Sequence, residues 1–160
     1  MSKVVLIGSS SAIAKSLQNQ SNREFVCFTR SNGFDISGDL SELDDLEDIN
    51  GLVYFPGTIN LKPFTMLKEQ DYQNDLDINF LGAVKVVKKL IGKLKEADGA
   101  SVVFISTVAA SIGLPFHASI SPSKAALEAY ARSMAAEYAG ARVSFNVVAP
   151  SLANTPMAEN

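Results

Sequence analysis

A glycine followed by three serines is the first group of residues along the chain whose types and spacing could do chemistry. Gly8 follows the strand-like run Lys3–Ile7, and a helical stretch is predicted over Ala12–Gln20. A glycine permits a tight turn, and a helix N-terminus offers free N–H groups and a partial positive charge to a phosphate group. Serine hydroxyls can bind phosphate or cap the helix, so a plain strand-to-helix turn capped by serine is the alternative. The candidate phosphate-binding residues are Gly8, Ser9, Ser10, Ser11 and Ile13.

Two further polar residues stand out from their surroundings. Asn79 lies within an apolar helical pattern, where an asparagine is costly unless its amide is hydrogen-bonded; an exposed helix position is the alternative. His117 is the only histidine, and histidine is the commonest general acid near neutral pH. An early helix start would place His117, Ile120 and Lys124 on one face, at spacings of three and four residues. Ser121-Pro122 is instead typical of a helix N-terminus, which would leave His117 in a loop, bonded to backbone.

Strands and helices alternate along almost the whole chain. Short β-branched and leucine runs predict strands buried on both faces, and apolar residues three and four apart predict helices. The predicted strands are Lys3–Ile7, Phe25–Thr29, a short one near Phe34–Ile36, Gly51–Phe55, Val102–Ile105 and Val143–Val148. The predicted helices are Ala12–Gln20, Tyr72–Lys95 and Ser123–Tyr138. This alternation predicts parallel strands joined by right-handed crossovers, with helices on both faces of one α/β domain spanning residues 1–160.

The composition argues against several classes of protein. A length of 160 residues is typical of one domain, and 47% hydrophobic residues can form a substantial core. The net charge of -3 offers no basic surplus to neutralise phosphates, so we expect no nucleic-acid partner. No apolar run reaches the roughly 20 residues of a membrane helix, and we expect no signal peptide before the first strand. With a single cysteine as well, the chain is predicted to be cytoplasmic, with no membrane partner and no metal site.

Taken in order, the motifs resemble those of the short-chain dehydrogenase/reductase family. The family's phosphate turn has three glycines; here Gly8 matches the first, and Ala12 and Ala14 replace the others. The family's Asn-Asn-Ala-Gly turn after its fourth strand corresponds to residues 54–57, where only Gly57 matches. Asn79 matches the asparagine of the family's next helix. Partial matches in the right order and at the right spacings extend over essentially the whole chain.

The family's catalytic residues are only partly present. The strand-end serine that orients the substrate oxygen corresponds to Thr107, and the lysine of the Tyr-x-x-x-Lys pair corresponds to Lys124. The tyrosine, which exchanges a proton with the substrate during hydride transfer, is replaced by Ile120. By resemblance, Lys124 binds the ribose hydroxyls of the cofactor, and Thr155 contacts the nicotinamide carboxamide. Isoleucine has no proton to give, so the sequence predicts binding better than turnover, and His117 is the candidate substitute acid.

The end of the second strand bears on the choice between the two nicotinamide cofactors. In dinucleotide-binding folds an acidic residue there binds the ribose 2′-hydroxyl, whereas an arginine accommodates a 2′-phosphate. This strand is followed by Arg30 and no acid, and arginine can bind phosphate through charge-assisted hydrogen bonds. A solvated surface charge is the alternative for Arg30. We therefore predict NADP rather than NAD, with Asp35 near the adenine by family resemblance.

The resemblance implies a Rossmann-like, doubly wound parallel sheet with strand order 3-2-1-4-5-6. The family's substrate lid and last strand would follow residue 160, so we expect this single dinucleotide-binding domain to be incomplete at its C-terminus. The leading hypothesis is an NADP(H)-dependent oxidoreductase that transfers hydride between the cofactor and a small-molecule carbonyl or alcohol. The alternatives are a catalytically silent dinucleotide-binding sensor or partner subunit, and a scaffold that binds no dinucleotide. The family's matching helices pack against a partner, which implies a homodimer or homotetramer that buries side chains such as Tyr130 and Met134.

Overall fold

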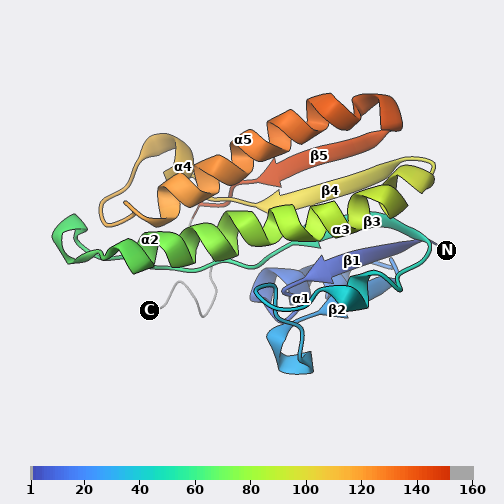
Figure 1. Ribbon diagram of the computed structural model, residues 1–160, viewed down its shortest axis with the longest axis horizontal. Helices are drawn as coiled ribbons and strands as arrows, with labels where there is room; N and C mark the ends of the chain where they lie inside the picture. Colours follow the sequence, from blue (N-terminus) through green and yellow to red (C-terminus); the bar gives the residue numbers. More distant parts are fainter. Residues whose placement is uncertain (1, 152–160) are drawn as a thin grey trace.

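Five parallel strands form the sheet of the described part of the chain. The computed structural model describes residues 2–151. The strands are β1 (Lys3–Ile7), β2 (Phe25–Phe28), β3 (Ile49–Tyr54), β4 (Ala100–Ile105) and β5 (Val143–Val148). Their order in the sheet is β2-β1-β3-β4-β5 (Figure 1). All neighbouring pairs are parallel, so the carboxyl ends of the strands lie at the same edge of the sheet. The predicted fold class is confirmed.

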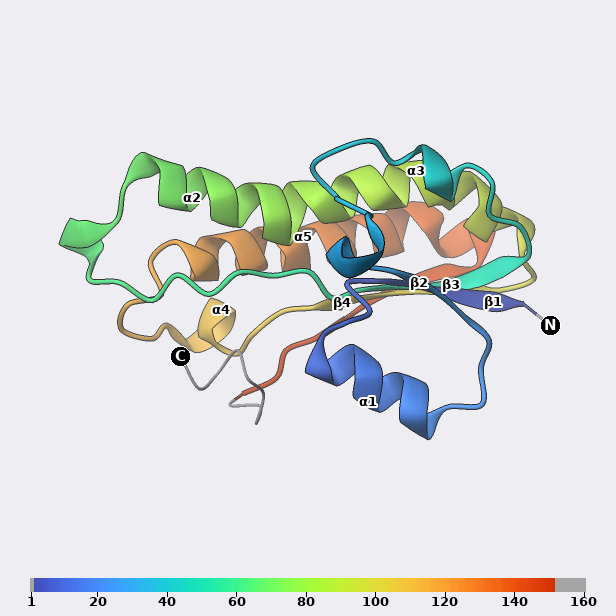
Figure 2. The ribbon, with the colours of Figure 1, turned by 90° about the horizontal axis from the view of Figure 1, so that it is seen from below.

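Helices cover both faces of this sheet (Figure 2). α1 (Ala12–Gln20) lies on one face, whereas α3 (Gly82–Glu96) and α5 (Ile120–Tyr138) lie on the other. α2 (Glu69–Leu76) continues into α3 through a π-helical turn over Asp77–Leu81, so the predicted helix 72–95 is one long helix with an irregular centre. The short helix α4 (Ala109–Ile112) follows β4. Within residues 2–151, no helix is long and apolar enough to cross a membrane.

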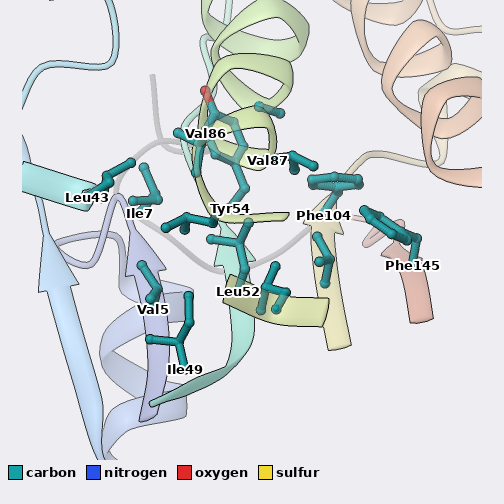
Figure 3. Packing of buried hydrophobic residues seen from close by; sticks show 14 of the residues in the cluster. Val5, Ile7, Leu43, Ile49, Leu52, Tyr54, Val86, Val87, Phe104 and Phe145 are labelled. Atoms are coloured by element: carbon teal, nitrogen blue, oxygen red, sulfur yellow. The ribbon is translucent and has the colours of Figure 1, made fainter. Parts of the chain in front are cut away.

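The core lies between the sheet and the layer of α3 and α5 (Figure 3). The strand and α3 side chains of the core that are at most 1% exposed include Val5, Ile7, Leu52, Tyr54, Phe104, Val86 and Val87. Burying an aliphatic or aromatic side chain of this size stabilises the fold by roughly 1.5–3 kcal/mol. This packing holds the carboxyl ends of β1, β3 and β4 in fixed positions relative to the long helix.

Tyr54 accounts for the irregular centre of the long helix. Its hydroxyl, at the end of β3, donates a hydrogen bond of 2.6 Å to the carbonyl of Ile78, inside the π-helical turn. A side chain that inserts into the ladder of helix hydrogen bonds is a known cause of such local distortion. Burial raises the pKa of Tyr54 above its ordinary value, so the hydroxyl remains a donor. The same turn carries the fully buried Asn79, which is thereby placed near the end of β3.

The short strand predicted near Phe34–Ile36 is wrong, because this segment folds into turns. The Asp35 carboxylate accepts from the N–H of Ser37 at 2.9 Å, and the Asp35 carbonyl accepts from the N–H of Gly38 at 3.0 Å. These local bonds use backbone groups that a sheet ladder would need. Phe34 is nevertheless buried, with its ring centroid 4.8 Å from that of Phe28, so the apolar pattern reports core packing rather than a strand. The five strands keep the predicted order with strand 3 left out.

Helix α5 begins at Ile120, three residues before the predicted start at Ser123. Pro122 lies in the first helical turn, where its missing N–H costs nothing because the first N–H groups of a helix have no partner within it. Tyr130 and Met134, expected at a partner interface, are half-buried and pack against the core of their own chain. The Tyr130 ring lies 6.0 Å from that of Phe104, so much of its apolar surface is already covered.

Candidate functional site

The turn after β1 forms the first part of the site. Gly8 has a φ of 78°, in the left-handed region, and a Cβ there would lie 3.1 Å from Cδ of Pro56, so glycine is required twice over. Ser11 caps α1, because its Oγ accepts from the N–H of Ala14 at 3.1 Å. Ser9 is only 7% exposed and its Oγ lies 3.5 Å from the carbonyl of Phe28. The three serines therefore have different surroundings. Ser11 caps α1, Ser9 is buried, and Ser10 is exposed to solvent, where its hydroxyl could contact a ligand.

The end of β2 lies beside this turn. The Oγ of Ser10 and the Oγ1 of Thr29 are 2.8 Å apart, which joins the two segments. The next residue, Arg30, is exposed, and no carboxylate of the described residues forms a salt bridge with it. Asp35 is also exposed and is engaged with the backbone of its own turn. The predicted contacts of Ser10 and Arg30 thus lie at one edge, with a free guanidinium group next to the glycine turn.

Gly57, after β3, forms the floor of the second part of the site. A Cβ at Gly57 would lie 3.1 Å from Oδ1 of Asn79 and 3.4 Å from Nζ of Lys124. Both polar groups thus converge on the space above the Gly57 backbone, which only the absence of a side chain leaves open. The long helix contributes the asparagine and α5 contributes the lysine. The structure brings together three residues that are far apart in the sequence and that sequence analysis had grouped by family resemblance.

Asn79 is fully buried, and its amide is satisfied by hydrogen bonds. Its Nδ2 donates to Oγ1 of Thr58 at 2.8 Å and to the carbonyl of Asp75 at 2.8 Å. Its Oδ1 accepts from the N–H of Thr58 at a longer 3.4 Å. With both amide protons used, the free lone pair of Oδ1 is the group that Asn79 presents above Gly57.

Lys124 is 7% exposed, and its Nζ donates to the carbonyl of Ile105 at 2.7 Å. Burial lowers the pKa of Lys124 to about 8, against an opposing, smaller effect of the negative charge on Asp75. An ammonium group has three protons, so two remain available to a ligand. At neutral pH the site therefore holds a buried, largely protonated ammonium group beside an amide oxygen, an arrangement suited to hydroxyl groups of a sugar.

The segment after β4 and the start of α5 hold two further residues that sequence analysis assigned to the site, Thr107 and Ile120. Thr107 is half-buried, and its Oγ1 accepts weakly from the N–H of Ala109 at 3.3 Å. Its neighbour Ser106 is buried and donates to Glu128 at 2.5 Å, so that hydroxyl is occupied. Ile120, which sequence analysis matched to the family's tyrosine, is 5% exposed, and its replacement of the tyrosine stays a prediction.

His117 is half-buried in the loop that precedes α5. It precedes α5, its carbonyl accepts from the N–H of Ser121 at 2.9 Å, and its Nδ1 lies 2.7 Å from the carbonyl of Pro115. It lines a surface hollow of about 460 Å³ together with Phe64 and Phe116, and Lys124, Asn79 and Thr107 are not among the lining residues. Its role as an acid stays a prediction. Thr155, the expected nicotinamide contact, lies outside the described residues.

Sequence analysis did not identify Asp75 or Thr58 as site residues. Asp75 is fully buried one helical turn before Asn79, and Thr58 donates a short hydrogen bond to its Oδ1. A signal was present, since residues four apart share a helix face and Asp75 therefore shares the face of Asn79. For Thr58, the only sequence feature that could have indicated a site residue is its position directly after Gly57.

A parallel sheet with a glycine turn after β1 and polar groups at the carboxyl ends of its strands is the architecture of the doubly wound α/β folds. The family model described as short chain dehydrogenase matches residues 11–160. The chain belongs to the short-chain dehydrogenase/reductase family.

Relatives and solved structures agree with this assignment. Oxidoreductase UcpA of Salmonella typhimurium is 32% identical over 113 residues, which cover 70% of this chain and 43% of that protein. A 3-oxoacyl-[acyl-carrier-protein] reductase of Synechocystis is 33% identical over 121 residues, covering 74% and 48%. The chain spans about half the length of the curated relatives it matches. A short chain dehydrogenase of Burkholderia cenocepacia in complex with NADP superposes with a TM-score of 0.87 at 21% identity, covering 99% of this chain and 75% of that one.

Proposed function

We propose that the chain binds NADP(H) across the carboxyl ends of β2, β1, β3 and β4 and acts as an oxidoreductase on a carbonyl or alcohol. The observation that carries this proposal is the convergence of Asn79 Oδ1 and Lys124 Nζ on the open space above Gly57. A side chain at Gly57 would fill that space, so the residues present fit a ribose there. The family resemblance assigns the ribose hydroxyls to the lysine.

The phosphate groups of the cofactor fit the carboxyl ends of β1 and β2, on the other side of the site from Gly57. Gly8 lets the backbone turn closely, and the first N–H groups of α1 and the exposed Ser10 hydroxyl can bind the pyrophosphate. Arg30 stands beside this turn without a carboxylate partner, which favours a cofactor with a 2′-phosphate. The Burkholderia neighbour and the protein ElxO were both crystallised with NADP bound, which supports the same choice.

Bound NADPH would supply the hydride, and the chain's own residues would bind and orient the substrate. Thr107 offers a half-buried hydroxyl near the end of β4 to the substrate oxygen. Ile120 cannot move a proton, so the proton must come from another group, and His117 is the proposed donor. Ile120 is also the observation that favours the second candidate function, a dinucleotide-binding protein without turnover.

A titration of the full chain with NADPH and with NADH tests the proposal, with Gly57→Ala as the informative variant. The added methyl group would lie within 3.4 Å of both polar groups, so NADPH affinity should fall at least about tenfold, as expected when a ligand contact is lost. Gly92→Ala is the matched control, because a Cβ there meets nothing within 4 Å. Equal affinities in the two variants would reject the site. Turnover is then measured on a panel of carbonyl compounds as loss of NADPH; binding without turnover would favour the silent protein.

A further inference from the structure

Asp75 is a buried carboxylate that the proposed function leaves unused. It is 0% exposed, and its Oδ2 has no hydrogen-bond partner among the described residues. A buried carboxyl group is costly unless its oxygens are hydrogen-bonded or its charge is paired. Its Oδ1 accepts a short hydrogen bond from the Thr58 hydroxyl. Asp75 therefore belongs to the polar network that ends above Gly57.

The hydrogen bond between Thr58 and Asp75 sets the direction of that network. The Thr58 hydroxyl has a single proton, and it donates that proton to Oδ1 of Asp75. The Thr58 oxygen must then accept, and the group that donates to it is Nδ2 of Asn79, at 2.8 Å. The second Nδ2 proton goes to the Asp75 carbonyl at 2.8 Å. With Nδ2 held on this side, Oδ1 of Asn79 has to face Gly57 and Lys124.

Asp75 also acts on Lys124 through space. The two side chains do not form a salt bridge, and the negative charge on Asp75 opposes, to a smaller extent, the lowering of the Lys124 pKa by burial. The Nζ of Lys124 donates to the Ile105 carbonyl at 2.7 Å, and it lies beside the same open space above Gly57 as the Oδ1 of Asn79. Glu128, one turn further along α5, is bonded to Ser106 at 2.5 Å.

We propose that Asp75 is a positioning residue of the cofactor site, which orients the Asn79 amide through Thr58 and balances the ammonium charge of Lys124. Asp75 itself contacts no ligand. This role rests on the proposed function, because the groups it positions are those assigned to the ribose. The geometry of the network, however, can be tested in the free protein.

The charge component is tested by the titration of Lys124 in the full chain, followed by NMR with lysine side chains labelled at Cε. Lys124→Arg assigns the resonance. Asp75→Asn keeps the shape of the side chain and a hydrogen-bond acceptor but removes the charge. In this variant the midpoint of the Lys124 titration should fall below its parent value by about one pH unit. Asp77→Asn, which removes an exposed carboxylate of the same helix, should leave the midpoint unchanged. If Asp75→Asn does not fold, Asp75→Leu makes the same test with an apolar residue of similar size.

The orienting component is tested by Thr58→Val, which removes the hydroxyl and keeps the charge. The side-chain amide protons of Asn79 should exchange faster with solvent and shift in resonance, while the Lys124 midpoint stays near the parent value. Thr58→Ser restores the hydroxyl and should restore the Asn79 signals. An unchanged Lys124 midpoint in Asp75→Asn, or unchanged Asn79 signals in Thr58→Val, would overturn the proposal.

Binding separates this inference from the proposed function. NADPH affinity should decline as the pH rises and Lys124 loses its charge. In Asp75→Asn this decline should begin at a lower pH than in the parent, because a smaller fraction of the Lys124 side chains is charged at any given pH. A parent chain that binds no NADPH contradicts the proposed function and leaves the two NMR results standing. A parent that binds NADPH with the same pH dependence as Asp75→Asn contradicts the positioning role alone.

Discussion

Replacing Lys124 by methionine should stabilise the fold by an amount that depends on pH. Lys124 is 7% exposed, and burial lowers its pKa from 10.5 to about 8. Between these two values the unfolded chain binds more protons than the folded chain, so stability rises with pH across this window. Near pH 7 the buried charge costs the folded state about 3 kcal/mol, and near pH 9.5 it costs about 1 kcal/mol.

Urea unfolding followed by circular dichroism at the two pH values measures this difference directly. The gain in the free energy of unfolding of Lys124→Met over the parent should be about 2 kcal/mol smaller near pH 9.5 than near pH 7. Loss of the Nζ hydrogen bond to Ile105 shifts both measurements equally, so it does not enter the comparison. Working below pH 10 also keeps most of the unfolded tyrosine side chains neutral, which matters because burial raises the pKa of Tyr54 and Tyr130 in the folded chain.

Lys88→Met serves as the control, because Lys88 is exposed on α3 and its ammonium group stays in water. Its replacement should change stability by the same small amount at both pH values. If the difference in the free energy of unfolding between Lys124→Met and the parent is also the same at both pH values, the reasoning is refuted. Such a result would mean that Lys124 is solvated in the folded chain.

The remaining predictions concern the cofactor, the turn, the chemistry and the assembly. Arg30→Ala should cost about tenfold or more in NADPH affinity and leave NADH affinity unchanged, as a calorimetric titration would reveal; equal losses for both cofactors would remove the 2′-phosphate assignment. Gly8→Ala should lower the free energy of unfolding by about 1–2 kcal/mol, because its left-handed φ disfavours a Cβ; a melting temperature like the parent's would contradict this. Ile120→Tyr should raise turnover on the order of 10²-fold, whereas His117→Ala should lower it by a similar factor with cofactor affinity unchanged; parent-like rates in His117→Ala would exclude that histidine as the acid. Light scattering of the full chain should give a dimer or tetramer, and a monomer at micromolar concentration would contradict the predicted assembly.

Local rules account for the parts of the fold that the sequence predicts well. The boundaries of β1, α1 and β5 match the structure, because each is set by a short apolar run or a cap next to a turn residue. The burial of Asn79 also follows from its apolar helical neighbours. The segment 34–36 shows the limit of local patterns, since Phe34 is buried against Phe28 of β2 while the backbone of the segment is bonded within a turn.

The site is less predictable because its geometry depends on contacts between distant segments. The approach of Asn79 and Lys124 to Gly57 is formed by the packing of two helices on three strands, which no local pattern encodes. The link from Asp75 through Thr58 joins residues 17 apart in the sequence, and the long helix face alone does not reveal it. Family resemblance supplied the Asn79 and Lys124 assignments and said nothing of Asp75.

Binding of NADPH at the carboxyl edge of the sheet is the central claim, and chemical-shift mapping of the full chain tests it most directly. On titration with NADPH, the backbone amide signals of Gly8, Gly57 and Lys124 should shift together and saturate. The amide signals of Gly99 and Gly140, which lie toward the opposite edge near the amino ends of β4 and β5, should remain in place. Shifts confined to Gly99 and Gly140, or no saturable shift at any of the five positions, would contradict the account.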